Sequence, residues 1–318
     1  MDFNMLLGFL QILKKSIKIV TKNGRLVAIV TSIYLIIVPL FFLLNLSTIK
    51  PIVNDLFTKA VLLPSLDPRG LLFAQVLVTI QKDVKSFFGF ELVFLLTLFL
   101  TSLFACNAII LLTGASYNDE KISHKDLILR MPRSFIRLFV TSFQVTLLRV
   151  GFLYIGFIAL MVPAITVFGH KIMSKVILWV LVILISSLYL YFSVVWVLSL
   201  VVSVLEECSG IEALGKAARL VKGKKLDGFL LNILVNLLSY PFFQGLSKLI
   251  VVKQSYLTQA VFLFFLMSCI CFIIALEFQA YTVLYLECKK SHNEEIELHG
   301  SIKYTEITKM PLESEDLP

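Results

Sequence analysis

The chain has 318 residues, of which 58% are hydrophobic and 16% are charged, and its formal net charge is +8. Soluble domains are about 45–50% apolar and about 25% charged, so this composition excludes a single soluble core and favours a chain whose surplus apolar surface faces lipid. The cations lie in short loops between apolar runs, which indicates a membrane surface rather than nucleic acid as the partner of the positive charge.

Residues 1–25 predict an amphipathic helix on the cytosolic face of a membrane. Apolar side chains recur on one face at helical spacing: Phe3, Leu6, Leu7, Leu10, Leu13, Ile17 and Val20. Lys15, Lys18 and Lys22 lie on the opposite face. Helices of this kind lie in the membrane interface with their cations toward the headgroups, so we expect these three lysines to contact anionic lipid.

Six apolar runs follow, and each is long enough to cross the ~30 Å hydrocarbon layer as a helix of roughly 20 residues. They cover residues 26–46, 88–112, 150–168, 176–205, 229–250 and 259–286. The sequence therefore predicts an all-α polytopic membrane domain over 26–286. Residues 287–318 are polar and aperiodic, which is typical of a disordered tail, and we expect this tail to be cytosolic and accessible to protein partners.

The distribution of Lys and Arg predicts the orientation of the chain. Because the number of spans is even, both termini lie on one side of the membrane, and nineteen Lys and Arg residues lie on that side against nine on the other. Loops rich in Lys and Arg stay in the cytosol. Both termini are therefore expected to be cytosolic, in the plasma membrane or the endomembrane system.

The segment between the first two spans, residues 47–87, contains a further apolar stripe. After the turn DPRG, apolar residues recur at helical spacing: Phe73, Val76, Leu77, Ile80 and Val84. This spacing predicts a helix that lies along the outer leaflet; of two roles for it, a lid or a helix packed against the bundle, we favour packing.

Three spans carry a proline at a matching distance from a boundary residue. The spacing is 14 residues from Arg25 to Pro39, from Arg149 to Pro163 and from Asp227 to Pro241. Proline removes a backbone donor and bends a helix, and in lipid the neighbouring helices must satisfy the carbonyl that is left. The spacing predicts a threefold internal repeat with a shared bend in the first, third and fifth spans.

A short basic helix is predicted between the fourth and fifth spans, in VLEECSGIEALGKAARLVKGKK. Ser209 and Glu212 match an S-x-x-E capping box, which satisfies free N–H groups at a helix start, and Gly223 is typical of a helix end. One face carries the apolar side chains of Ile211, Leu214, Ala218 and Val221. Lys216 and Arg219 lie on another face, and we expect both to contact lipid headgroups.

This segment, together with the six spans, resembles a large family of uncharacterised plant integral membrane proteins. It is more distantly similar to the membrane domain joined to some bacterial glycerophosphodiester phosphodiesterases, in which a V-x-E…AL…L-x-x-G element also lies between spans. The resemblance covers most of the chain, from the first helix to about Leu286. It implies a six-span fold of unknown function and no catalytic residue, because the bacterial active site belongs to a separate soluble domain.

Polar residues within the spans are candidates for a site inside the membrane: Glu91, Glu277, Lys248, Asn232 and Asn236. A charge at the bilayer centre costs at least about 2.5–3.5 kcal/mol, so such groups face a partner or a cavity. Asn232 and Asn236 share a face of the fifth span and can bond across the bundle. One interpretation is a polar pathway through the bundle; the other, which we favour, is contact between helices with Glu91 at the interface.

The sequence favours a non-enzymatic function. It contains no P-loop, dinucleotide-binding, zincin or nucleophile-elbow motif, and its His and Cys spacing matches no metal site, so we expect no cofactor. We expect a scaffold that organises anionic membrane lipid, with no nucleic acid partner. The alternative is a transporter or channel for a small solute or lipid, because helices bent at matched repeat positions are typical of transport sites.

Overall fold

The computed structural model describes residues 11–18, 24–118, 123–166, 173–251 and 255–291, and all regular structure in these ranges is helical. Residues 11–18 form a short helix. The other α-helices are α2 (Gly24–Leu62), α3 (Leu71–Tyr117), α4 (His124–Thr166), α5 (Met173–Leu205), α6 (Ile211–Leu220), α7 (Lys225–Val251) and α8 (Tyr256–Ser291). Two 3₁₀ turns, η1 (Leu63–Ser65) and η2 (Val221–Gly223), follow α2 and α6.

Six of these helices are long and apolar enough to cross a membrane, namely α2, α3, α4, α5, α7 and α8. The prediction of an all-α polytopic membrane protein with six transmembrane helices is therefore confirmed. The third predicted span is the second half of α4, which begins much earlier, at His124.

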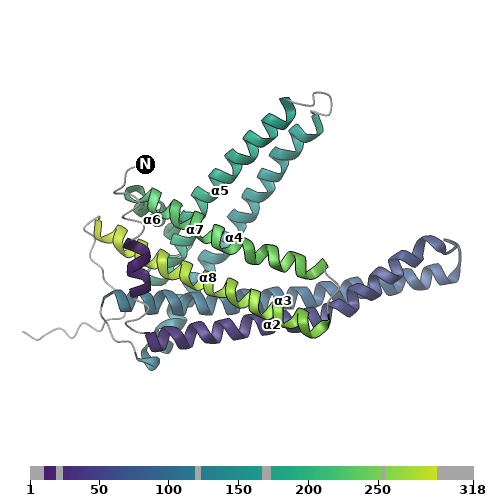
Figure 1. The fold of residues 1–318 in the computed structure, drawn as a ribbon, viewed down its shortest axis with the longest axis horizontal. Helices are drawn as coiled ribbons and strands as arrows, with labels where there is room; N and C mark the ends of the chain where they lie inside the picture. Colours follow the sequence, from purple (N-terminus) through teal and green to yellow (C-terminus); the bar gives the residue numbers. More distant parts are fainter. Residues whose placement is uncertain (1–10, 19–23, 119–122, 167–172, 252–254, 292–318) are drawn as a thin grey trace, which may run out of the picture.

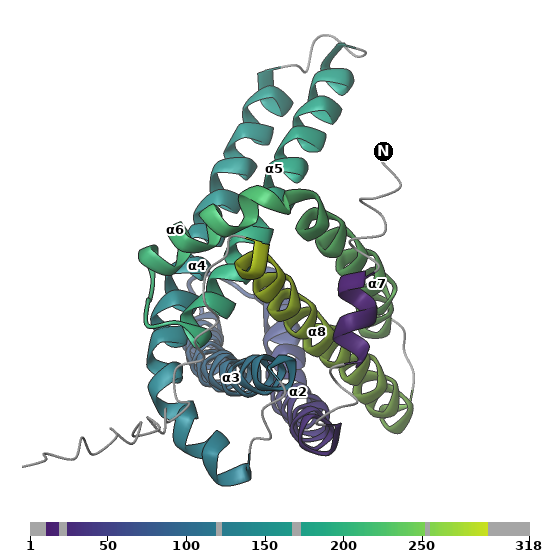
Figure 2. The same cartoon turned by 90° about the vertical axis from the view of Figure 1, so that its left-hand side faces the viewer.

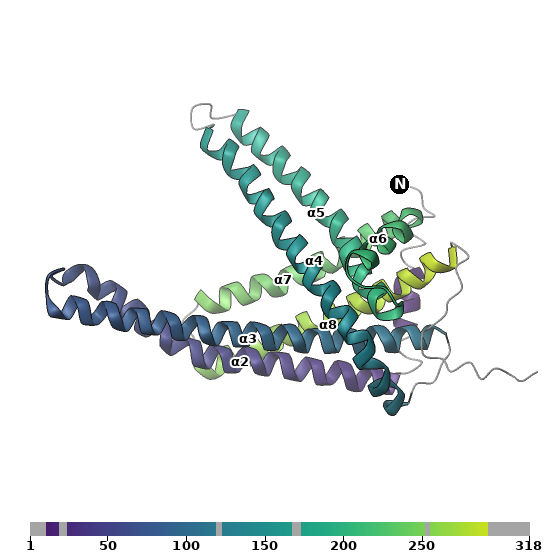
Figure 3. The ribbon, with the colours of Figure 1, turned by 180° about the vertical axis from the view of Figure 1, so that it is seen from behind.

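The long helices form two antiparallel hairpins, α2 with α3 and α4 with α5, which diverge from a common end (Figure 1). The same divergence is visible from behind in Figure 3. Between the hairpins lie α7 and α8, and α8 contacts α2, α3, α5, α6 and α7. Because it touches so many neighbours, α8 is the central helix of the bundle.

We call the common end of the hairpins the basic end. It contains the helix at 11–18, the starts of α2, α4 and α7, the ends of α3, α5 and α8, and all of α6 (Figure 2). These are the segments in which the sequence concentrates Lys and Arg. Buried apolar residues gather at this end: Leu112, Ala115, Leu198, Val201, Val202, Ala213, Ala217, Tyr281, Leu284 and Tyr285.

The helices away from the basic end expose large apolar side chains instead. Examples are Phe88, Leu92, Tyr154, Ile155, Trp179 and Ile183. Exposed apolar surface of this extent must be covered by lipid tails, because in water it would cost about 25 cal/mol per Å².

The α2–α3 hairpin extends well beyond the thickness of a bilayer. Its helices have 39 and 47 residues, and at 1.5 Å per residue they are roughly 58 and 70 Å long, against about 30 Å of hydrocarbon. The stripe from Phe73 to Val84 is the first part of α3 rather than a separate helix along the outer leaflet, so that prediction is wrong. The partner helix explains the difference, because α2 runs on beside it and Lys59 binds Asp83 at 2.7 Å across the hairpin.

Pro39 lies inside α2, and a neighbouring helix satisfies the carbonyl that it leaves free. A proline at 39 removes the N–H that would bind the Leu35 carbonyl. The Ser268 hydroxyl of α8 donates to this carbonyl at 3.2 Å, and shares its proton with the Phe264 carbonyl at 2.8 Å. Pro241 likewise lies inside α7. The common depth and bend of the three prolines, and the threefold repeat, stay predictions.

We expect Ser268→Ala to destabilise the protein by about 0.6–1.7 kcal/mol, the range of hydrogen bonds between membrane helices. In a Pro39→Ala background the restored amide at 39 binds Leu35, so the same substitution should cost less. Thermal unfolding of the four proteins of this cycle in detergent measures the coupling. An equal cost of Ser268→Ala in both backgrounds would contradict the role given to Ser268.

Candidate functional site

Glu206, directly after α5, gathers three donors from two other helices at the basic end. The Lys216 ammonium of α6 lies 2.6 Å from its carboxylate, and the Lys289 ammonium of α8 lies 3.4 Å away. The Tyr285 hydroxyl of α8 donates to the same carboxylate. The first glutamate of VLEEC therefore joins α5, α6 and α8.

The donors around Glu206 outweigh its burial. Burial alone would raise the pKa of the Glu206 carboxyl. The hydrogen bonds from Lys216 and Tyr285 and the charges of Lys216 and Lys289 lower it by more than burial raises it, so the pKa of Glu206 lies below the ordinary glutamate value. Glu206 is thus ionised at neutral pH. A lowered pKa in the folded state adds stability above the unfolded pKa, and this stability is lost as the pH falls through the folded one.

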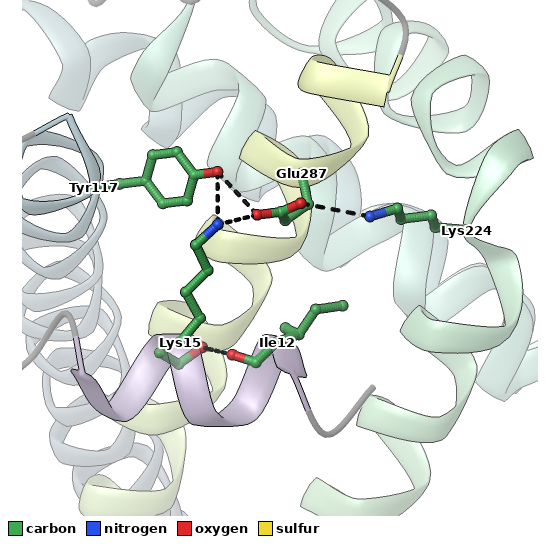
Figure 4. A network of polar contacts seen from close by, with 6 residues as sticks. Ile12, Lys15, Tyr117, Lys224 and Glu287 are labelled. Atoms are coloured by element: carbon green, nitrogen blue, oxygen red, sulfur yellow. Dashed lines mark hydrogen bonds and ion pairs between the residues drawn. The ribbon is translucent and has the colours of Figure 1, made fainter. Parts of the chain in front are cut away.

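Glu287, two residues beyond Tyr285 on α8, is the centre of a second cluster (Figure 4). Its carboxylate accepts hydrogen bonds from Lys15 and from the Tyr117 hydroxyl, the latter at 2.9 Å, and lies 3.7 Å from the Lys224 ammonium. Lys15 also donates to the Tyr117 hydroxyl at 3.2 Å. This cluster fixes the helix at 11–18 against α3, η2 and α8.

The start of α6 differs from the prediction. Gly210, not Ser209, is the N-cap, and no side chain caps the helix, so the predicted capping box of Ser209 and Glu212 is wrong. The Gly210 N–H instead donates to the Thr141 hydroxyl of α4 at 2.8 Å. Gly210 has φ +62°, and a Cβ there would lie 2.5 Å from the Gln144 amide oxygen. Tertiary contact with α4 therefore replaces the local cap.

Alanines at helical spacing bring α6 close to its neighbours. Ala213 and Ala217 are fully buried, while Ile211 is 75% exposed. Lys216 projects to Glu206, and Arg219 is exposed. The apolar side chain of Ile211 is thus free of the protein core and available to lipid.

Two asparagines, Asn232 and Asn107, join neighbouring spans. Asn232 of α7 donates to the Leu190 carbonyl of α5 at 2.9 Å, and Asn236 donates to the Asn232 carbonyl at 2.7 Å within α7. Asn107 of α3, which sequence reasoning missed, is fully buried. Its amide donates to the Met131 carbonyl of α4 at 3.0 Å and accepts from Ser134 at 2.8 Å. The sequence signal that could have identified Asn107 is a single asparagine within an otherwise apolar run.

The charged candidates inside the spans do not form one site. Glu91 on α3 is partly buried and Lys248 on α7 is exposed. Among the described residues, no hydrogen bond or ion pair joins these two side chains. Glu277 on α8 is partly buried and interacts electrostatically with Arg149 of α4. The sequence therefore identified Glu277 but not the residue that faces it.

Arg149 contacts more of the bundle than its predicted boundary position implied. Its guanidinium lies 5.8 Å from the ring of Trp196 on α5, which is a cation–π distance. Arg149 thus contacts α5 through Trp196 and interacts electrostatically with Glu277 of α8. Within the described residues, no group of three or more His, Cys, Asp or Glu side chains is placed to hold a metal ion.

The lysines that the sequence predicts to contact lipid headgroups differ in their surroundings. Lys15 and Lys216 bind carboxylates of the protein, as described above. Lys18 is exposed, and Lys22 lies outside the described residues, as does the tail from 292 onward. Contact of any of these residues with lipid stays a prediction.

The fold and these clusters define an all-α multi-pass membrane protein whose helices are joined by partly buried carboxylates at one end. The chain belongs to the family described as "Domain of unknown function (DUF8558)", whose model matches residues 2–316. A search of curated proteins finds no match, and a search of solved structures finds none either.

We expect Glu206→Gln to lower the free energy of unfolding by about 1.5–3 kcal/mol, the value of a hydrogen bond to a charged group. Glu212→Gln makes the same change of charge on an exposed side chain of α6 and is the matched control. The wild type and the control should lose stability as the pH falls below about 4.3, whereas Glu206→Gln should lose less over the same range. Thermal unfolding in detergent from pH 3 to 7 measures this; parallel profiles of all three proteins would contradict it.

The helix at 11–18 should depend on Lys15 rather than on the neighbouring Lys14, which is exposed. Lys15→Gln removes the ion pair with Glu287, so we expect backbone amides of 11–18 to exchange hydrogen at least severalfold faster. Lys14→Gln should leave exchange unchanged. Hydrogen exchange in nanodiscs with and without anionic lipid measures both effects. If only Lys14→Gln, or only the lipid, changes exchange, the Glu287 cluster does not hold this helix.

Proposed function

We propose that the protein is a non-enzymatic membrane scaffold that organises lipid around two diverging helix hairpins. The supporting observation is the contrast between the two ends of the bundle (Figure 1). At the basic end, Glu206 and Glu287 join six helical elements around an apolar core. Away from it, the hairpins separate and expose apolar side chains.

Lipid is the natural occupant of that part of the angle between the hairpins which α7 and α8 do not fill (Figure 1). The α4–α5 hairpin exposes apolar residues on both of its helices, among them Tyr154, Ile155, Trp179 and Ile183. In a membrane, such surfaces are covered by acyl chains, and their polar backbone is satisfied within the helices. A rigid angle held at one end would therefore order the lipid between its sides.

Anionic lipid is the partner that the charge favours. Glu206 and Glu287 pair with Lys15, Lys216 and Lys289, but other cations of the basic end are exposed: Lys14, Arg219 and Lys222. Each cation near a membrane surface contributes about 1 kcal/mol of attraction to anionic lipid. This supports a basic end on the cytosolic leaflet of the plasma membrane or an endomembrane, with both termini cytosolic and the tail accessible to protein partners.

One observation favours the alternative of a transporter or channel for a small solute or lipid. Glu277 and Arg149 place an acidic and a basic side chain within the bundle, and the two interact electrostatically. A cavity of about 180 Å³ also lies between α2, α3, α4, α5 and α8, and its wall includes Tyr34, Ser102 and Ser142. Most of that wall is apolar, however, which favours the scaffold.

Electron paramagnetic resonance of spin-labelled lipids in liposomes tests the proposal. We expect motionally restricted lipid around the wild type, with anionic lipid preferred over zwitterionic lipid. The triple variant Lys14→Gln, Arg219→Gln and Lys222→Gln should lose most of this preference and keep the restricted fraction. Solute flux above that of empty liposomes, without a lipid preference, would favour the transporter instead.

A further inference from the structure

A cavity of about 550 Å³ opens between α2, α7 and α8, away from the basic end. Ligand sites in proteins typically have about 300–1,000 Å³. Much of the wall is apolar: Phe42, Leu46, Leu246, Leu249, Leu263 and Met267. The apolar Ile49 and Val53 also line it, together with four polar side chains: Asn45, Lys50, Asn54 and Gln259.

Three of the four polar wall residues lie toward the outer end of the cavity. On α2, Phe42 and Leu46 precede Lys50 and Asn54. On α8, which runs in the opposite direction, Gln259 comes before the apolar wall residues. The two polar stretches therefore meet, and Lys50 donates to the Gln259 amide oxygen at 3.2 Å. The outer part of the wall thus brings together Lys50, Asn54 and Gln259 beside the apolar Ile49 and Val53, while the inner part of the wall on α2 and α8 is apolar except for Asn45.

The polar part lies at the depth of the second headgroup layer. Lys50 follows Arg25, at the start of α2, by about 37 Å along the helix at 1.5 Å per residue. This distance slightly exceeds the hydrocarbon thickness of about 30 Å. If Arg25 lies at one surface of the membrane, Lys50 lies at the other.

We propose that this cavity binds one phospholipid of the leaflet opposite the basic end. Its acyl chain lies along Phe42, Leu46 and Met267, and its phosphate is bound by the Lys50 ammonium. An ammonium group has three donors, so Lys50 can bind a phosphate oxygen while it holds Gln259. The amide of Asn54 lies on the same wall and is a further donor.

The chemistry of the wall selects this occupant. An apolar inner part excludes a free polar anion, whose transfer from water would be costly. A single cation at the rim distinguishes a phospholipid from an uncharged lipid such as diacylglycerol, which has the same chains without the phosphate. The site goes beyond the proposed function, because the ordering of lipid between the hairpins does not require Lys50.

Native mass spectrometry of the purified full chain tests the site. The probes are dioleoyl phosphatidylglycerol and dioleoylglycerol, added to delipidated protein. We expect one phosphatidylglycerol per chain, bound more tightly than diacylglycerol. Lys50→Gln should weaken phosphatidylglycerol about fivefold, the loss of one cation–headgroup contact, and leave diacylglycerol unchanged.

Two further variants define the site. Lys82→Gln makes the same change of charge on an exposed residue of α3 outside the cavity wall, and should change neither affinity. Leu46→Trp fills the inner part and should weaken both lipids. If Leu46→Trp does not fold, Lys50→Gln and Lys82→Gln still decide the phosphate contact.

Several outcomes would overturn the site. One is an equal effect of Lys50→Gln and Lys82→Gln on the affinity for phosphatidylglycerol, and another is displacement of phosphatidylglycerol by inorganic phosphate. The others are unchanged lipid binding to folded Leu46→Trp and a dimer of the chain that excludes lipid. The resonance experiment on bulk lipid separates this result from the scaffold proposal, because Lys50→Gln should leave the restricted fraction and its anionic preference unchanged.

Discussion

The arrangement of the basic end depends on two partly buried, ionised carboxylates, Glu206 and Glu287. Removing a carboxylate from water costs several kcal/mol unless donors replace the lost hydration. Glu206 and Glu287 each receive three donors, and these come from elements far apart in the chain. Because both clusters include α8, they can form only when α3, α5, α6, η2 and the helix at 11–18 are assembled around it. The packing of this end is therefore cooperative.

The helices are joined tightly at the basic end, and this leaves them free to diverge elsewhere in the bundle. The described polar contacts farther along the spans are fewer and join pairs of helices: Asn107 joins α3 to α4, and Asn232 joins α7 to α5. Helix pairs held in this way can diverge, as the two hairpins do in Figure 3. The scaffold proposal and the phospholipid cavity both rest on this division, but on different surfaces.

The candidate residues could be predicted only in part. An acid or amide in an apolar run is visible in the sequence, which is why Asn232 and Glu277 were identified. Their partners were not visible, because the Leu190 carbonyl is a backbone group and Arg149 lies more than a hundred residues from Glu277. The same reason explains the capping error at α6, since the hydroxyl that accepts the Gly210 N–H belongs to Thr141 of α4, which the local sequence around Gly210 does not contain.

The sequence by itself determined the helical class and the six apolar helices in order, because hydrophobic length and backbone hydrogen bonding in lipid leave few alternatives. It did not determine where α2 and α3 end, because a helix continues past the membrane when its neighbour runs beside it, as Lys59 and Asp83 show. Only the tertiary structure decided which of the many cations pair with Glu206 and Glu287 and which are exposed. Charge counts depend on residue type alone, whereas an ion pair depends on which helices lie within a few ångströms of each other.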